Sequence, residues 1–350
     1  MLDTYFVGEI TEIQKMGNTC KSSKNGQVVE TTQKDMSHST DMTQLVGLKG
    51  TSNPVQFPLR EKIILNHDTR IFRFSLPSKS HTLGLPIGNH IAINAKLQNE
   101  KGEDENIIRA YTPVSTENDK GYFDLLIKVY HQNTHEKFPK GGKMTSNVIE
   151  NLKIGEEITI IGPNGRIEYV APGEFSIKAN KKQVPPSGNA PYPSLNSKLN
   201  YTKKVTKIGM IAAGSGITPM LQIIKQVLND ENDNTELYLL FANRTEKDIL
   251  CKQELDDFAE NPKYKGQLKV NYILSQPETD EWKEDPGKLT GRIGFDVFMK
   301  TLPKYASICG GNSQGDDTLM CICGPPPMIE EVAVPGLKKM GYEDEDIFVY

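Results

Sequence analysis

The sequence predicts two folded domains, an antiparallel β-barrel followed by an α/β domain with a doubly wound parallel sheet. Short β-rich runs separated by turns fill residues 53–178 and leave little room for helix, as in small barrels. Strands and helices alternate over residues 205–350, as expected of a parallel sheet with helical crossovers. Residues 179–204, rich in Pro, Ser and Asn, separate the two parts as a linker or surface insertion.

The N-terminal residues 1–52 are polar and lack sustained periodicity, which predicts a disordered tail. Within this tail, the run MGNTCKS at 16–22 is similar to an N-myristoylation start beside a palmitoylation cysteine. If translation began at Met16, acyl chains on Gly17 and Cys20 would anchor the protein, because two chains bind a membrane stably and one binds it only marginally. An ordinary polar tail is the alternative interpretation.

Alternating β-branched and aromatic residues, interrupted by Pro, Gly or Asn-His-Asp, mark the strands of the first domain. The expected strands are Arg60–Leu65, Arg70–Leu76, His90–Ala95, Asn106–Val114, Tyr122–Tyr130, Glu157–Ile161 and Arg166–Val170. Apolar residues at helical spacing predict a short helix at Met144–Leu152.

The second domain alternates apolar runs of strand length with amphipathic runs of helix length. The expected strands are 206–212, Leu237–Ala242, Leu268–Leu274, Leu319–Cys323 and Ile347–Tyr350. The expected helices are 219–229, Lys252–Ala259, Phe295–Thr301 and Met328–Met340.

The stretch Val205–Leu228 joins the first strand of the second domain to its first helix. Its apolar run 208–212 predicts a strand that is buried on both faces. Gly214–Gly216 follows as a turn in which the backbone can approach a ligand closely, and Thr218 is expected to cap a helix that begins at Pro219. A strand, a small-residue turn and a helix N-terminus suit a nucleotide, with an ordinary strand–helix crossover as the alternative.

The composition is that of a soluble globular protein: 350 residues, 37% hydrophobic and 25% charged, with a net charge of −4. The lack of a basic excess argues against nucleic-acid binding. No apolar run approaches the length of a membrane-spanning helix, and the N-terminus lacks the layout of a secretory signal. Five unevenly spaced cysteines argue against a disulfide framework. Cys321 and Cys323 share a strand face, but no histidine lies nearby, so no metal site is expected.

The segment Arg109–Ser115 (RAYTPVS) ends an expected barrel strand with a cation, an aromatic ring and a hydroxyl. Arginine binds phosphate in bidentate geometry, a tyrosine ring packs on flat groups, and a threonine hydroxyl donates hydrogen bonds. This combination suits a phosphate-bearing aromatic cofactor. An ion-paired arginine beside a half-buried tyrosine is the alternative.

The same segment resembles the flavin-binding R-x-Y-T-P-x-S signature of the ferredoxin-reductase-like flavoenzymes, and among these the cytochrome b5 reductases. Further stretches of residues 54–350 resemble that family in the same order: HDTR at 67–70, LGLPIG at 83–88, IKVY at 127–130, GGKM at 141–144, the stretch 209–221, LFANRTEKD at 240–248 and CGPPPM at 323–328. The resemblance implies a barrel that binds FAD and an α/β domain that binds a pyridine nucleotide.

The resemblance also implies roles for residues of the barrel. Arg109 would hold the FAD pyrophosphate, Tyr111 would pack along the flavin and ribityl chain, and Thr112 would lie beside the flavin ring. Backbone N–H groups of the segment 142–146 would hold phosphate at a helix start, with either hydroxyl of Thr145-Ser146 assisting. The implied FAD contacts are Arg109, Ala110, Tyr111, Thr112, Leu126, Lys128, Tyr130, His131, Gly142, Lys143, Met144, Thr145 and Ser146.

In the second domain, the resemblance places the glycine turn between the flavin edge and the incoming nicotinamide. The implied nucleotide contacts are Gly214, Ser215, Gly216, Thr218, Ser275, Cys323, Gly324, Pro325 and Met328. Thr112, Lys128 and Cys323 are the side chains expected nearest to the reacting atoms. The terminal Tyr350 is expected to cover part of the flavin pocket.

One position departs from the family pattern. NADH-preferring relatives carry an acidic residue after the third strand of this domain, where this chain has Ser275. NADH is the expected nucleotide, but NADPH use stays open because the carboxylate that would repel a 2′-phosphate is missing.

The resemblance implies hydride transfer from NADH to FAD and then single-electron transfer to ferricytochrome b5, without a side-chain nucleophile. Lys143 and Lys181-Lys182 match basic positions that dock acidic cytochrome b5 in relatives, with simple solvation as the alternative. The alternative functions are a flavin reductase that serves another one-electron acceptor or a quinone, and a non-catalytic nucleotide-binding module. A monomer is expected on the cytoplasmic side of the endoplasmic reticulum or of the outer mitochondrial membrane.

Overall fold

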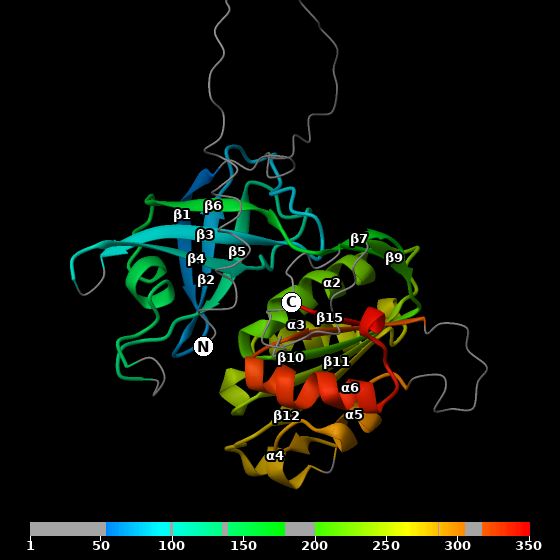
Figure 1. The fold of residues 1–350 in the computed structure, drawn as a ribbon. Helices are drawn as coiled ribbons and strands as arrows, with labels where there is room; N and C mark the ends of the chain where they lie inside the picture. Colours follow the sequence, from blue (N-terminus) through cyan, green and yellow to red (C-terminus); the bar gives the residue numbers. More distant parts are fainter. Residues whose placement is uncertain (1–53, 99–100, 135–138, 179–199, 286, 305–316) are drawn as a thin grey trace, which may run out of the picture.

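The computed structural model describes residues 54–98, 101–134, 139–178, 200–285, 287–304 and 317–350. Figure 1 shows two lobes, a β-rich one formed by the first half of the chain and an α/β one formed by the second half. The N-terminal tail with its lipidation motif and most of the predicted linker lie outside the described residues. Among the helices in these ranges, none combines the length and apolar character needed to cross a membrane.

The first lobe is a curled antiparallel sheet of six strands in the order β4-β3-β6-β1-β2-β5. The strands are β1 Val55–Ile64, β2 Thr69–Ser75, β3 His90–Gln98, β4 Asp104–Tyr111, β5 Tyr122–Lys128 and β6 Glu157–Asn164. The Val114 N–H donates to Asp124 O (3.0 Å), which ties the chain after β4 to β5 at the opposite edge of the sheet. Phe57 and Phe123 meet edge-on inside, 5.2 Å apart. The predicted antiparallel barrel is confirmed.

The second lobe is a parallel sheet of six strands in the order β13-β12-β11-β10-β14-β15. Its strands are β10 Lys207–Ala213, β11 Glu236–Asn243, β12 Leu268–Leu274, β13 Leu289–Thr290, β14 Thr318–Cys323 and β15 Ile347–Val349. The helical elements are η2 Gly214–Gly216, α2 Ile217–Asn229, η3 Glu246–Asp248, α3 Lys252–Glu260, η4 Pro262–Tyr264, α4 Asp280–Glu284, α5 Phe295–Thr301, η6 Met328–Ala333, α6 Val334–Lys339 and η7 Asp344–Asp346. Successive strands run outward from β10 in opposite directions along the sheet, which confirms the doubly wound topology.

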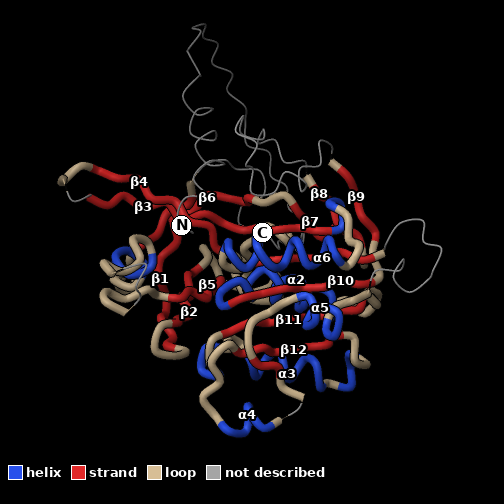
Figure 2. The backbone as a smooth tube through the Cα atoms, turned by 60° about the horizontal axis from the view of Figure 1, so that its bottom comes forward, coloured by secondary structure: helices blue, strands red, loops and turns tan. Residues whose placement is uncertain are grey.

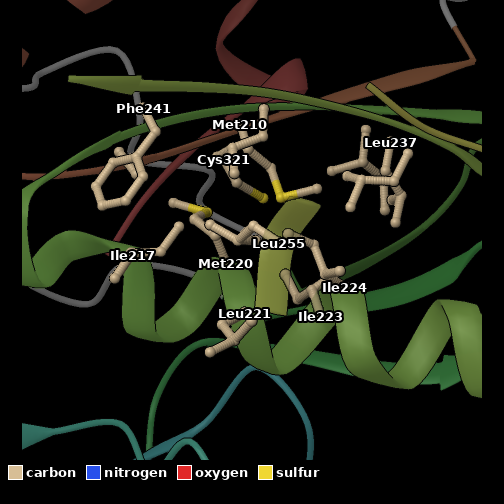
Figure 3. Close-up of a cluster of buried hydrophobic side chains, with 14 of the residues drawn as sticks. Met210, Ile217, Met220, Leu221, Ile223, Ile224, Leu237, Phe241, Leu255 and Cys321 are labelled. Carbon is tan, nitrogen blue, oxygen red and sulfur yellow. The ribbon is translucent and has the colours of Figure 1, made fainter. Parts of the chain in front are cut away.

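Strand β10 lies at the centre of this sheet and is buried on both faces, as predicted. Its residues alternate between two cores: Met210 faces α2, whereas Ile211 packs with residues of α5 and α6. Figure 3 shows Met210 and Cys321 of the sheet lying above Met220 on α2. The central strand therefore fixes the position of the turn that follows it.

The start of α2 differs from the prediction. The helix begins at Ile217, with Gly216 as its N-cap, and the small-residue turn winds as the 3-10 helix η2 that leads directly into it. The Thr218 hydroxyl donates to Ser215 O (3.2 Å) and caps nothing. The predicted start at Pro219 is wrong because the glycine turn is already helical.

A small third sheet, β7-β8-β9, was only partly predicted. It consists of β7 Ile167–Ala171, β8 Glu174–Ile177 and β9 Tyr201–Lys204, so the last residues of the expected linker form a strand. Strand β9 has only four residues, too few for a clear period-two pattern. The short elements α4 and β13 were missed for the same reason.

Two predicted helices are irregular. The helix expected at Met144–Leu152 is a single π-helical turn, η1 Thr145–Ile149. The helix expected at Met328–Met340 divides into the π-helical η6 and the α-helical α6, and Pro335 lies in the first turn of α6. Because proline has no backbone N–H, it removes one i→i−4 bond where the two parts meet.

The two lobes are joined by direct contacts along α2, which lies between the sheet and the barrel in Figures 1 and 2. The Gly88 N–H donates to Gln222 Oε1 (2.7 Å), and Lys225 Nζ donates to Val114 O (2.9 Å). Leu126 of β5 is buried in the same apolar core as Ile217 and Met220 of α2. The carboxyl ends of β10 and β14 are therefore held against the barrel.

We expect His90, the first residue of β3, to make the free energy of unfolding depend on pH. Burial lowers the pKa of His90 to about 4 from 6.5, so the unfolded chain takes up a proton near pH 6.5 that the folded protein excludes. This contribution is present above pH 6.5 and is lost as the pH falls toward 4. Between pH 7 and pH 5, denaturant unfolding should show a fall in the free energy of unfolding that is about 2 kcal/mol larger in wild type than in His90→Gln. Equal losses in the two proteins would contradict this assignment.

Candidate functional site

A turn of two glycines lies against the end of β5. Gly141 has a positive φ of +79°, and a Cβ there would come within 2.9 Å of Tyr130 O. A Cβ on Gly142 would overlap Thr145 Oγ1. The Gly142 N–H donates to Tyr130 O (2.8 Å), and Thr145 Oγ1 accepts from the Tyr130 N–H (3.4 Å). The chain therefore forms a narrow cradle that only glycines can line, with the first N–H groups of η1 beside it.

Arg109 and Tyr111 lie on the face of β4 that looks toward this cradle. Because side chains alternate along a strand, every second residue of β4 (105, 107, 109 and 111) shares one face. On this face, Ile107 is buried and Tyr111 packs against the barrel core. On that same face, Glu105 pairs with Lys143 of the glycine turn (2.7 Å). Arg109 and Tyr111 are both half-buried. The two strongest motifs of the barrel thus converge on one surface.

The nucleotide turn of the second domain touches the end of β14. A Cβ on Gly216 would overlap Cys323 O and lie 2.7 Å from the Cys323 carbonyl carbon. A Cβ on Gly324 would come within 2.6 Å of Met328 Cε and 3.1 Å of Ala213 Cβ. Gly216 is needed because backbone meets backbone here, whereas an added Cβ on Gly324 would press on the side chains of Met328 and Ala213. The turn η2 also lies beside β5 of the barrel, so the predicted nucleotide and flavin segments meet at the lobe junction.

Two side chains at this junction have perturbed acid–base properties. Burial raises the pKa of Cys323 to about 12, so its thiol stays protonated at neutral pH. Burial also raises the pKa of Tyr350 well above 10. The Tyr350 hydroxyl is buried and has no hydrogen-bond partner within the described chain, although its backbone N–H donates to Ile322 O (3.0 Å). A buried hydroxyl without a partner is a group that a bound ligand can satisfy.

Lys128, one of the predicted site residues, lies near carboxylates of both lobes. Its Nζ lies 2.7 Å from Asp68 Oδ2 and 3.8 Å from Asp248 Oδ1. Asp68 belongs to the turn between β1 and β2, whereas Asp248 belongs to η3, so one cation links the two lobes. His67, Asp68 and Asp248 are close enough to hold a metal ion, but Lys128 already supplies the positive charge there.

Sequence reasoning missed both carboxylate partners of Lys128. Asp68 and Asp248 lie within the family-like stretches 67–70 and 240–248, but those stretches assign them no partner. Asp248 also completes the pattern Thr245-x-x-Asp248, a capping box in which Asp248 Oδ2 accepts from the Thr245 N–H at 3.0 Å. That pattern explains the turn but says nothing about a distant lysine. Gln222, which bonds Gly88 across the lobes, was missed because a buried amide on a helix gives no sequence signal.

The remaining predicted site residues lie on several elements of the two lobes. Ala110 of β4, Leu126 of β5 and Ser146 of η1 belong to elements that border the cradle or the β5–η2 contact, and Thr112 and Met144 adjoin β4 and η1 in the chain. Ser275, by contrast, follows β12, two strands from β10, and lies at the outer part of the sheet edge. The Lys143 ammonium donates to both carboxylate oxygens of Glu105 (2.7 and 2.8 Å). His131 and Pro325 lie at the rim, half-buried and exposed respectively.

These groups fit FAD and a pyridine nucleotide. The glycine cradle offers N–H groups at a helix start, and Arg109 adds a cation on the same face, which suits a pyrophosphate. The close approach of Gly216 to Cys323 leaves a surface of backbone for a flat ring, next to the unsatisfied Tyr350 hydroxyl.

Comparison with known proteins also indicates that the chain binds FAD and a pyridine nucleotide. Residues 56–169 match the oxidoreductase FAD-binding domain family, and residues 210–333 match the oxidoreductase NAD-binding domain family. The chain is 41% identical over 312 residues to NADH-cytochrome b5 reductase 2 of Mus musculus, an alignment that covers 89% of this chain and 100% of that protein. It is also 41% identical over 293 residues to NADH-cytochrome b5 reductase 2 of Homo sapiens, covering 84% of this chain and 93% of the relative.

Among solved structures, the chain is similar to the cytochrome b5 reductase domain of Ulva prolifera nitrate reductase. The TM-score is 0.70 at 35% sequence identity, with 85% of this chain and 97% of that domain covered. The resemblance seen in the motifs is confirmed, and FAD and NADH are the cofactors. The chain belongs to the NADH–cytochrome b5 reductase family of FAD-dependent oxidoreductases.

Proposed function

We propose that this protein oxidises NADH and delivers the electrons, through FAD bound at the lobe junction, to ferricytochrome b5. The observation that supports this acceptor best is the alignment over the whole length of a relative named NADH-cytochrome b5 reductase 2. When bound, FAD accepts a hydride and releases electrons singly, which couples a two-electron donor to a one-electron haem.

The residues of the barrel would bind and orient the flavin cofactor. The Arg109 guanidinium would form bidentate bonds to the pyrophosphate, assisted by N–H groups of the turn Gly142–Thr145. Tyr111, which packs against the barrel core, would hold one side of the isoalloxazine and ribityl chain. Thr112 would direct its hydroxyl to the ring edge. These barrel residues would bind and position the cofactor and would not act as acids or bases.

The residues of the second lobe would bring the nicotinamide against the flavin. The backbone contact between Gly216 and Cys323 sets how closely a ring can approach η2. The Cys323 thiol stays neutral, so it would pack against the ring without adding negative charge. Lys128, held by Asp68 and Asp248, would keep the two lobes in register for this approach. Leu126 and α2 share one apolar core, which would limit the access of water to the rings.

We also propose a monomer on the cytoplasmic side of the endoplasmic reticulum or of the outer mitochondrial membrane. The lipidation motif at Gly17 and Cys20 is what suggests membrane association. Mass spectrometry of the native N-terminus should find an acylated Gly17, and an unmodified Met1 would contradict the anchor. Because Lys143 is paired with Glu105, Lys181-Lys182, outside the described residues, are the cations we propose for docking.

The function is tested by following ferricytochrome b5 reduction by NADH with the FAD-loaded protein. We expect saturable, NADH-dependent reduction whose second-order rate falls about tenfold as salt rises from roughly 50 to 500 mM, because electrostatic attraction speeds docking. Ferricyanide reduction by NADH serves as the control, because docking to cytochrome b5 does not limit its rate. Rapid ferricyanide reduction with no reduction of cytochrome b5 would overturn the proposed acceptor and favour another one-electron partner or a quinone.

A further inference from the structure

Three exposed residues lie together where β11 and β12 end. The Ser275 N–H donates to Asn243 O (3.1 Å), and the Gln276 N–H donates to Arg244 O (2.8 Å). These bonds continue the pairing of β11 with β12 beyond the register pair Asn243 and Leu274. Arg244, Ser275 and Gln276 are therefore fixed side by side on the sheet edge, with their side chains in solvent.

The positive charge of Arg244 is not neutralised. Its Nε donates to Gln276 Oε1 (2.7 Å), and an amide carries no charge. No carboxylate of the described residues lies within ion-pair distance of this guanidinium. The nearby acidic groups are engaged elsewhere: Glu278 pairs with Lys247 (2.9 Å), and Glu246 accepts from the Glu278 N–H (2.9 Å). One unpaired cation therefore remains here, in a fixed position.

This cation lies along the sheet edge from the nucleotide turn. The turn Gly214–Gly216 follows β10, and β11 and β12 are the next strands outward. Strands are spaced by about 4.8 Å, so the end of β12 lies about 10 Å from the end of β10. In dinucleotide-binding sheets the adenosine ribose occupies this region: a carboxylate there binds the 2′-hydroxyl of NADH, whereas an arginine accommodates the 2′-phosphate of NADPH. Ser275 supplies a neutral hydroxyl instead of a carboxylate.

We propose that Arg244 and Ser275 form a subsite for the 2′-phosphate of NADPH, so that this enzyme oxidises NADPH as well as NADH. Arg244 would bind the phosphate through its free guanidinium nitrogens while Gln276 holds Nε, and Ser275 would donate its hydroxyl. The proposal rests on the proposed nucleotide-oxidising function and extends it to a second donor. The hydride leaves the same nicotinamide carbon in both donors, so the chemistry is unchanged.

The test uses the FAD-loaded full chain and three variants, Arg244→Ala, Ser275→Asp and Lys247→Ala. Anaerobic stopped-flow gives kcat/KM for flavin reduction by NADPH and by NADH. We expect Arg244→Ala and Ser275→Asp each to lower the NADPH value about tenfold or more, and Arg244→Ala to change the NADH value by less than about twofold. Lys247→Ala removes a neighbouring cation that is already paired with Glu278, and should leave the ratio unchanged.

Calorimetric titration with 2′-AMP and 5′-AMP provides a readout that does not depend on turnover. Wild type should bind 2′-AMP about tenfold more tightly than 5′-AMP, and Arg244→Ala should abolish the difference. Equal affinities in wild type, or equal loss of NADH and NADPH use in Arg244→Ala, would overturn the subsite. Arg244-dependent flavin reduction by NADPH without cytochrome b5 reduction would support the subsite while overturning the acceptor. The two proposals therefore fail separately.

Discussion

The Arg109→Ala variant is expected to purify without FAD and to lose at least about 99% of NADH oxidation at ordinary FAD concentrations. Arg109 shares a face of β4 with Glu105, which is bonded to the Lys143 ammonium of the glycine turn. A bidentate arginine–phosphate contact contributes about 2–3 kcal/mol, and its loss weakens FAD binding about 100-fold. The protein itself should stay folded, because the Arg109 side chain is only half-buried.

The measurement is the ratio of flavin absorbance to protein absorbance, combined with a titration of added FAD. Arg60→Ala, which removes an exposed cation from β1, three places from β4 in the sheet, is the matched control and should retain a full complement of FAD. Arg109→Lys should fall between the two, because lysine supplies charge without the bidentate geometry. Full FAD content in Arg109→Ala would show that the pyrophosphate is held elsewhere.

The Gly216→Ala variant is expected to lose both stability and nucleotide turnover. Its Cβ would overlap Cys323 O, and because the neighbour is backbone, η2 and the end of β14 must move apart. Such overpacking costs about 1–3 kcal/mol. A displacement of about 1 Å at a reacting centre lowers the rate about 100-fold. We therefore expect kcat/KM for NADH to fall about 100-fold while FAD remains bound.

Gly266→Ala is the matched control for this variant. Gly266 has a φ of +74° and no atom within 4 Å of an added Cβ, so alanine there meets backbone strain but no clash. It lies before β12, at the end of the sheet away from the nucleotide turn. We expect Gly266→Ala to lower the free energy of unfolding by about 1 kcal/mol and to leave NADH turnover unchanged. Equal turnover in Gly216→Ala and Gly266→Ala would contradict the assigned nicotinamide surface.

The parts of the fold that the sequence predicted well have strong periodicity. β10 and α2 are largely buried elements whose apolar residues repeat at strand and helix spacing, and the structure packs them on each other as expected. The start of α2 was misplaced because rules for capping residues assume an extended residue before the helix. Here Gly216 adopts a helical φ of −62° and the 3-10 turn runs straight into α2.

The elements that were missed depend on tertiary contacts. β9 has four residues and gains its place from β8 and from the pairing of Lys203 with Asp346 of η7. α4 has five residues and is held by Trp282, whose Nε1 donates to Leu289 O (3.2 Å). The partners of β9 lie far away in sequence, and Trp282 bonds a residue beyond the end of α4, so the few residues within each element carry little signal for it.

The candidate site likewise has some residues that the sequence predicted and others that only the structure reveals. Motifs located the glycine cradle and the contact between Gly216 and Cys323 because close backbone approaches favour glycine there, and they located Arg109 because phosphate binding favours arginine. The partners of Lys128 are Asp68 and Asp248, which are 60 and 120 residues away along the chain, and only the fold brings them together. Sequence can therefore identify what a site must contain, whereas the charges that hold its two halves in register come from the structure.

The most direct measurement is the visible absorption of the purified protein under anaerobic conditions, before and after one equivalent of NADH and then ferricytochrome b5. We expect a flavin spectrum that bleaches with NADH and returns as the haem is reduced, because the proposed flavin and nicotinamide sites adjoin where β5 lies beside η2. A protein that takes up no FAD, or a flavin that NADH leaves oxidised, would contradict the account.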